Sequence, residues 1–92
     1  MNPLHEQRRH PRQPAEGSVT LWCVDCSPNK IEGRLTDTSE DGFRMVHTCA
    51  GLGAGRQVRF EHSGAEGIAC TVWSRILADS VETGLRLISG AK

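Results

Sequence analysis

Aromatic residues are scarce in this sequence. It contains no tyrosine, and the aromatic set consists of two tryptophans and two phenylalanines. A barrel that binds single-stranded nucleic acid needs outward-facing aromatic side chains along a basic groove, and four residues are too few to build such a platform. We therefore expect them to pack in the core or at its rim. These residues are Trp22, Phe43, Phe60 and Trp73.

Neither sign of charge is in surplus. Eleven Lys and Arg residues are matched by eleven Asp and Glu residues, so the formal net charge is zero. Proteins that bind DNA or anionic membranes over a wide surface need a basic surplus, and the balanced total argues against both partners. The balance is uneven locally, because residues 5–12 contain three arginines and a single glutamate. Positive charge is therefore concentrated near the N-terminus.

Long apolar runs are also missing. No run approaches the roughly 20 residues that span a bilayer. Charged and polar residues fill most of positions 5–13, where a signal peptide would be apolar. We therefore expect a cytoplasmic protein without membrane insertion. Its 92 residues suffice for one domain.

Signatures of catalysis are absent from the sequence. It has neither H-E-x-x-H nor G-x-S-x-G, and no base is placed near Ser39. The segment Gly51–Arg56 has the composition of a phosphate-binding loop, but such a loop precedes a helix, and here a strand pattern follows. We expect a flexible loop between strands at this point, no cofactor and no enzyme activity.

The four cysteines do not form a metal-binding pattern. Cys23 and Cys26 have C-x-x-C spacing, but a zinc site needs a second pair of ligands at similar spacing, and Cys49 and Cys70 do not supply it. Disulfides are typical of exported chains, and no export signal is visible. We therefore expect no metal, with Cys23 and Cys70 as small core residues and Cys26 beside a turn.

Alternation of apolar and polar residues is the main structural signal. Apolar side chains recur at every second position in six short segments separated by turn residues. Six strands in so short a chain predict an all-β fold, a small antiparallel barrel that is closed or nearly closed. The predicted strands are Gly17–Asp25, Lys30–Thr36, Gly42–His47, Arg56–His62, Gly67–Ile76 and Val81–Ile88. The apolar faces of these strands are predicted to carry Val19, Leu21, Cys23, Ile31, Gly33, Leu35, Val58, Phe60, Ile68, Cys70, Val72, Leu85 and Leu87.

Two polar segments point to a ligand. Residues 8–12 read Arg-Arg-His-Pro-Arg, and the proline favours an extended path that separates Arg8 from Arg12 by roughly 13 Å. Asp37–Gly42 is a tight polar turn that ends in a glycine free to adopt positive φ. Guanidinium forks bind phosphate and the O6/N7 edge of guanine, whereas a carboxylate and a hydroxyl bind its imino and amino edge. Together these segments predict a receptor for a guanine nucleotide with exposed phosphates.

Hairpin geometry brings the two segments together. If Asp25 pairs with Lys30 across the turn at Pro28, then Asp37 lies opposite Ser18. Residue 12 is six positions before Ser18, so we expect the N-terminal segment to fold back beside the Asp37 turn.

The R-x-x-x-R segment from Arg8 to Arg12, followed by the [D/N]-x-S-x-x-G turn, resembles the PilZ domain, and the resemblance covers nearly the whole chain. It implies a small β-barrel that binds the bacterial second messenger cyclic di-GMP. It implies an N-terminal ligand-binding arm at residues 1–16 and a barrel at residues 17–92, here with little or no C-terminal helix. The residues that it places at the ligand are Arg8, Arg9, Arg12, Asp37, Ser39 and Gly42.

The resemblance also implies a mode of action. The flexible arm would become ordered when cyclic di-GMP clamps it against the barrel. We expect no effector domain in the chain, so the output would pass to a downstream protein. Two alternatives remain open. The barrel could be a degenerate PilZ-like adaptor that binds no nucleotide, or an oligonucleotide-binding barrel.

Overall fold

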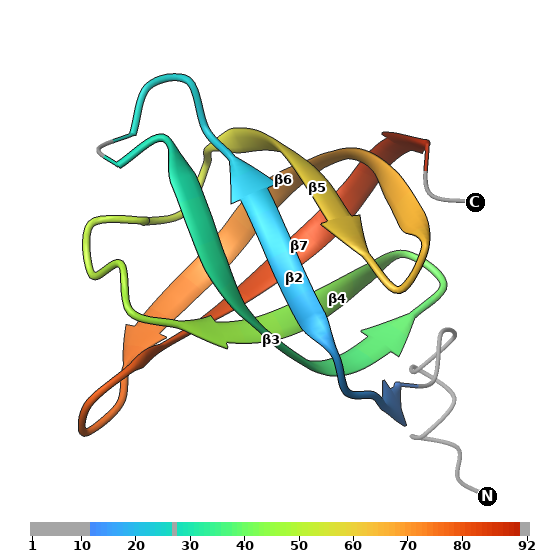
Figure 1. The fold of residues 1–92 in the computed structure, drawn as a ribbon, viewed down its shortest axis with the longest axis horizontal. Coiled ribbons are helices and arrows are strands. Elements are labelled where there is room, and N and C mark those ends of the chain that lie inside the picture. Colours follow the sequence, from blue (N-terminus) through green and yellow to red (C-terminus); the bar gives the residue numbers. More distant parts are fainter. Residues whose placement is uncertain (1–11, 27, 91–92) are drawn as a thin grey trace, which may run out of the picture.

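The computed structural model describes residues 12–26 and 28–90, and the regular elements in this part of the chain are all β-strands (Figure 1). The six predicted strands are present, and a short strand near the N-terminus is added to them. The strands are β1 (Gln13–Pro14), β2 (Ser18–Trp22), β3 (Lys30–Ser39), β4 (Gly42–His47), β5 (Gln57–His62), β6 (Ala65–Ile76) and β7 (Val81–Gly90).

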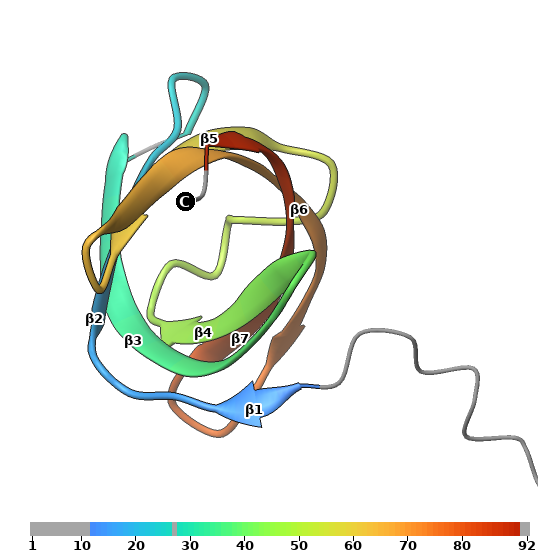
Figure 2. The same ribbon diagram turned by 90° about the vertical axis from the view of Figure 1, so that its right-hand side faces the viewer.

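Strands β2 to β7 close into a barrel. Hydrogen-bonded neighbours follow the order β1-β3-β2-β5-β6-β7-β4, and β3 also pairs with β4, which completes the ring. All pairings are antiparallel. In Figure 2 the ring encloses the interior, and β1 lies outside it beside β3. The predicted all-β antiparallel barrel is confirmed, and the described residues include no helix that could cross a membrane.

The core fills the barrel with side chains from every strand except β1. The buried rings of Phe43 and Phe60 pack against each other, with centroids 5.1 Å apart. The predicted inward faces of β2, β3 and β5 are confirmed at their apolar positions. The buried apolar residues are Val19, Leu21, Cys23, Ile31, Leu35, Phe43, Met45, Leu52, Val58, Phe60, Ala69, Val81 and Leu85.

The predicted face of β6 is wrong. Ala69 and Thr71 point into the barrel, whereas Val72 is 50% exposed. Two register irregularities in the β6–β7 pairing, at Ile68/Ala69 and Thr71/Trp73, interrupt the simple alternation. The cost of burying a hydroxyl is offset by hydrogen bonds, because the Thr71 hydroxyl donates to the Gly53 carbonyl (2.7 Å) and accepts from the Arg56 N–H (2.9 Å).

The glycine-rich segment connects β4 to β5, as predicted, and it also contributes to the core. Leu52 is buried in the main hydrophobic cluster. The Ser74 hydroxyl donates to the Leu52 carbonyl at 2.7 Å. In Figure 1 this yellow-green connection lies at one end of the barrel, and in Figure 2 it crosses the opening of the ring. The segment therefore fills one region of the barrel rather than only joining two strands.

The β2–β3 hairpin differs from the predicted register. Trp22, not Asp25, pairs with Lys30, so the connection between these two strands is longer than the tight turn that we expected. The Asn29 side-chain amide bridges the carbonyls of Cys23, Val24 and Cys26 at 2.8–3.0 Å. Such bonds satisfy a loop backbone that has no strand partner.

The cysteines also differ from expectation. Cys23 is buried as predicted, but it forms a disulfide with Cys26. Their Cα atoms lie 5.3 Å apart within the loop, which is a normal separation for a disulfide. Cys49 and Cys70 are free and partly buried, so Cys70 is not the core residue that the alternation predicted.

Candidate functional site

The short strand β1 places the end of the N-terminal segment beside the Asp37 turn. Gln13 pairs with Thr38 and Pro14 pairs with Asp37, so Arg12 comes next along the same ladder, at the level of Ser39. The predicted register would have put Ser18 opposite Asp37, but Ser18 pairs with Arg34. The predicted proximity of the two segments is therefore present, through a different register.

Arg12 joins the residues of the polar turn in a hydrogen-bond network. Its Nε–H donates to Asp37 Oδ1 at 3.1 Å, and its Nη1–H donates to Ser39 Oγ at 3.1 Å. The Ser39 hydroxyl in turn donates to Asp41 Oδ1 at 2.7 Å. The Arg12 side chain remains 29% exposed. Arg12 thus joins two other sequence-predicted site residues, Asp37 and Ser39, by direct hydrogen bonds.

Arg44 completes this network and was missed by the sequence analysis. It lies on β4 directly opposite Asp37. Its Nε–H donates to both carboxylate oxygens of Asp37 (3.1 and 2.9 Å), and its Nη2–H donates to Oδ2 at 2.5 Å. A two-residue turn after Ser39 pairs positions 37 and 44, so careful treatment of the β3–β4 hairpin could have found Arg44.

The two guanidinium groups determine the charge state of Asp37. Desolvation by burial would raise the pKa of this carboxyl, but hydrogen bonds and charges from Arg44 and Arg12 outweigh it and lower the pKa below the ordinary value. The pKa of Arg44 is raised, chiefly by its hydrogen bond to Asp37. Asp37 is therefore an ionised acceptor held between two cations.

Gly42 is required for close packing rather than for an unusual backbone angle. The sequence suggested a positive φ, but the described glycines with positive φ are Gly17, Gly55 and Gly64. A Cβ atom at position 42 would collide with the Leu85 carbonyl oxygen on β7. The absent side chain lets the start of β4 lie against β7.

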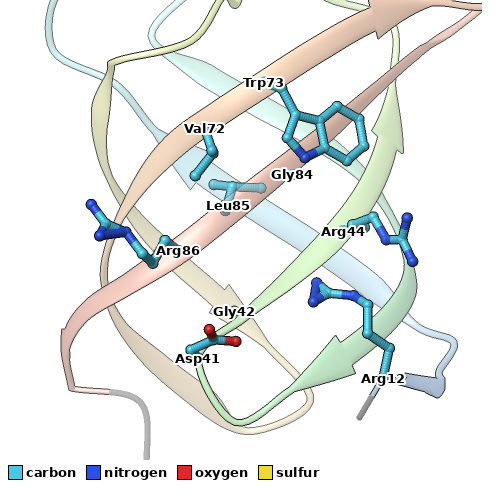
Figure 3. A pocket seen from close by; sticks show the side chains of 9 residues that line it. All are labelled: Arg12, Asp41, Gly42, Arg44, Val72, Trp73, Gly84, Leu85 and Arg86. Carbon is cyan, nitrogen blue, oxygen red and sulfur yellow. The ribbon is translucent and has the colours of Figure 1, made fainter. Parts of the chain in front are cut away.

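A groove of about 390 Å³ opens on the outer surface beside this network. Figure 3 shows Arg12 and Arg44 on one side of it and Arg86 on the other, with the Trp73 indole near its upper end. The groove crosses the outer faces of β4, β7 and β6. Its lining residues are Arg12, Asp41, Gly42, Arg44, Val72, Trp73, Gly84, Leu85 and Arg86.

Trp73 lies flat over Gly84, its cross-strand partner. A Cβ atom at position 84 would be 2.5 Å from the indole ring, so the glycine provides the space that the ring occupies. From the sequence, we expected all four aromatic residues in the core or at its rim. That holds for Phe43 and Phe60, whereas Trp22 packs under Arg59, with 3.9 Å from the guanidinium carbon to the ring centroid. The cross-strand pairing of Trp73 with Gly84 could have identified Trp73 as a groove residue, but recognising this pairing requires the β6–β7 register.

The remaining candidate residues, Arg8 and Arg9, lie outside the described residues. Residues 12–26 and 28–90 contain no group of three or more His, Cys, Asp or Glu side chains that could hold a metal ion.

The closed barrel with the short strand β1 beside β3 is a PilZ-like fold. No family model matches the sequence, and no curated protein matches it significantly. Among solved structures, the chain is similar to the inhibitor of motility MotI/DgrA of Bacillus subtilis, with a TM-score of 0.72 and 17% sequence identity. The match covers 99% of this chain and 49% of that chain, so this chain spans about half the length of MotI/DgrA. The likeness is one of fold.

Proposed function

We propose that this protein is a receptor for cyclic di-GMP, which binds in the groove beside Asp37 and orders the N-terminal arm. The observation that carries the proposal is the junction of Arg12 with Asp37 and Ser39 at the edge of a groove that also contains Arg44, Arg86 and Trp73. Two distant motifs with guanine- and phosphate-binding chemistry meet at one open cavity.

The chemistry of the groove matches the parts of this ligand. Each phosphate of cyclic di-GMP is an anion, and Arg12, Arg44 and Arg86 supply cations from three parts of the fold. The exposed face of Trp73 is a stacking surface for a purine, since base–aromatic stacking needs only a free π-face. A volume of about 390 Å³ lies in the usual range for small-molecule sites.

Guanine selectivity follows from the donors and acceptors at the site. An arginine fork donates to guanine O6 and N7, whereas adenine presents an N6 amino donor at the place of O6. Asp37 and Ser39 accept hydrogen bonds and therefore suit the N1–H and N2–H groups of guanine. We expect cyclic di-GMP to bind more tightly than cyclic di-AMP.

The arm supplies the signal in this proposal. β1 anchors the chain beside the groove, and Arg8 and Arg9 are only a few residues before Arg12. Contacts from these arginines to the ligand would order residues 1–11 and change the surface that a downstream protein meets. Hydrogen exchange measures this step: amides in residues 1–11 should exchange more slowly when cyclic di-GMP is present. Unchanged exchange in a saturated complex would remove the arm from the mechanism.

Calorimetric titration tests the function itself. We expect saturable binding of cyclic di-GMP and much weaker binding of guanosine monophosphate and of a single-stranded oligonucleotide. Binding of the oligonucleotide alone would favour an oligonucleotide-binding barrel. Absence of heat with all three would favour an adaptor that binds no nucleotide.

A further inference from the structure

The acceptors that would bind guanine are already occupied within the protein. Asp37 accepts three hydrogen bonds from Arg44 and one from Arg12. A carboxylate offers about four acceptor positions, so these bonds use its capacity. Ser39 Oγ accepts from Arg12 as well. Because Asp37 has no free acceptor position, a guanine edge could bind both residues only after one arginine has left.

The donors of Arg12 have the same chemistry as the donors of guanine. Guanine presents N1–H and N2–H groups on one carbon, which is the N–C–N pattern of a guanidine. Arg12 applies two N–H groups of its guanidinium to Asp37 and Ser39 at 3.1 Å each. We infer that Arg12 occupies the guanine subsite in the free protein and that cyclic di-GMP displaces it, while Arg44 remains on Asp37. This inference rests on the proposed function.

Arg12 is the arginine that the geometry allows to leave. It makes one hydrogen bond to Asp37, whereas Arg44 makes three, the shortest at 2.5 Å. Arg12 also precedes a two-residue strand that pairs only with β3. Arg44 lies within β4, which is paired with both β3 and β7. Moving Arg12 therefore disturbs much less of the sheet than moving Arg44.

Arg44 makes the exchange electrostatically tolerable. Removing the only partner of a partly buried carboxylate leaves an uncompensated charge, which is strongly unfavourable. Here the bidentate contact from Arg44 keeps Asp37 ionised and oriented after Arg12 departs. The released guanidinium is then available to the phosphates or to the O6/N7 edge of the ligand. Arg44 is therefore a positioning residue for Asp37.

The exchange requires two hydrogen-bond donors from the ligand. The base must donate two N–H groups to Asp37 and Ser39 in place of those of Arg12. Cyclic di-IMP keeps O6, N7 and N1–H but lacks the N2 amino group, so it can replace only one of them. A site built to bind such a donor rejects an analogue that lacks it. We expect cyclic di-IMP to bind at least about tenfold more weakly than cyclic di-GMP.

Arginine side-chain NMR of the full chain tests the exchange directly. The Nε–H signals of Arg12 and Arg44 are assigned from the variants Arg12→Lys and Arg44→Lys. Arg75 is an internal control, because its Nε–H donates to Glu82 and neither residue lines the groove. Saturating cyclic di-GMP should shift the Arg12 signal strongly and leave those of Arg44 and Arg75 close to their free positions.

The outcomes separate the two claims. If cyclic di-GMP binds but the Arg12 signal does not move, or if Arg44 shifts instead, the exchange is wrong and the proposed function stands. Equal affinities for cyclic di-IMP and cyclic di-GMP would also overturn the exchange alone. If calorimetry detects no binding of cyclic di-GMP, the proposed function fails, and the inference fails with it.

Discussion

At the scale of single residues, Asp37 organises the candidate site. Its carboxylate connects Arg12, which precedes β1, to Arg44 on β4. The spacing of short motifs in the sequence was enough to predict that Arg12, Asp37 and Ser39 lie together, because the β2–β3 hairpin places β1 beside the end of β3 that leads into the turn. To predict Arg44 and Trp73 as site residues, one needs the strand register and the face of the sheet on which each side chain lies. Alternation alone does not determine either of these.

Replacing Arg12 with alanine or lysine separates charge from geometry. A lost bidentate contact is worth about 1–3 kcal/mol, or roughly five- to 150-fold in affinity. Lysine keeps the charge but not the planar fork, so we expect both variants to lose most cyclic di-GMP affinity in calorimetry. Thermal stability should change little, because Asp37 keeps its bonds to Arg44. Near-native affinity of the lysine variant would mean that Arg12 contributes only its positive charge to binding.

A second prediction at this scale concerns Gly42. Its replacement by alanine places a Cβ against the Leu85 carbonyl, and overpacking of this kind costs about 1–3 kcal/mol. Thermal unfolding should show a melting temperature lower by roughly 4–8 °C per kcal/mol. Gly51→Ala is the matched control, because beyond Gly51 and its two chain neighbours no heavy atom lies within 4 Å of a Cβ there. Equal melting temperatures of the two variants would contradict the close-approach explanation.

At the scale of elements, strand existence was easier to predict than strand pairing. Alternation located the six barrel strands, since an apolar face must cover the core at every second residue. The β2–β3 register was wrong because Asn29 and the Cys23–Cys26 disulfide hold a longer loop. The face of β6 was wrong because Thr71 is polar, yet its hydroxyl is satisfied inside the barrel by the glycine-rich connection.

The connection between β4 and β5 should behave as part of the core. Leu52 is 1% exposed, and deleting a buried leucine side chain typically costs about 2–5 kcal/mol. We therefore expect Leu52→Ala to shift the denaturant midpoint strongly downward. The control Leu77→Ala removes a side chain that is 37% exposed, and its effect should stay near 0.5 kcal/mol in order of magnitude. Comparable midpoints would mean that the connection does not pack as described.

At the scale of the whole molecule, a buried polar chain links strands around the closed barrel. The Cys49 N–H donates to His47 Nδ1 at 3.0 Å, so the neutral ring carries its proton on Nε2 and donates it to Thr83 Oγ1 at 2.7 Å. Thr83 contacts Ser74, whose hydroxyl donates to the Leu52 carbonyl. Each polar group of this hydrogen-bond network has a partner, as buried polar groups require.

The buried histidines lead us to expect that acid destabilises the fold. Desolvation lowers the pKa of His47 below its ordinary 6.5, and it also lowers the pKa of His62. The unfolded chain therefore binds more protons, so the stabilising contribution is present above about pH 6.5 and is lost as pH falls through the lower folded pKa. The urea midpoint should decrease from pH 7.5 to pH 5. His47→Gln does not titrate, so its decrease should be smaller. An unchanged midpoint in the wild type would contradict this prediction.

The central claim is that a guanine dinucleotide binds in the groove at Trp73. Trp22→Phe leaves Trp73 as the only tryptophan of the two in the chain, so its fluorescence reports on the groove alone. We expect saturable quenching of Trp73 by cyclic di-GMP, with far weaker quenching by cyclic di-AMP. The complementary variant Trp73→Phe keeps Trp22, which packs under Arg59 away from the groove, and its emission should stay nearly constant. An unresponsive Trp73, or a response from Trp22 instead, would contradict the account.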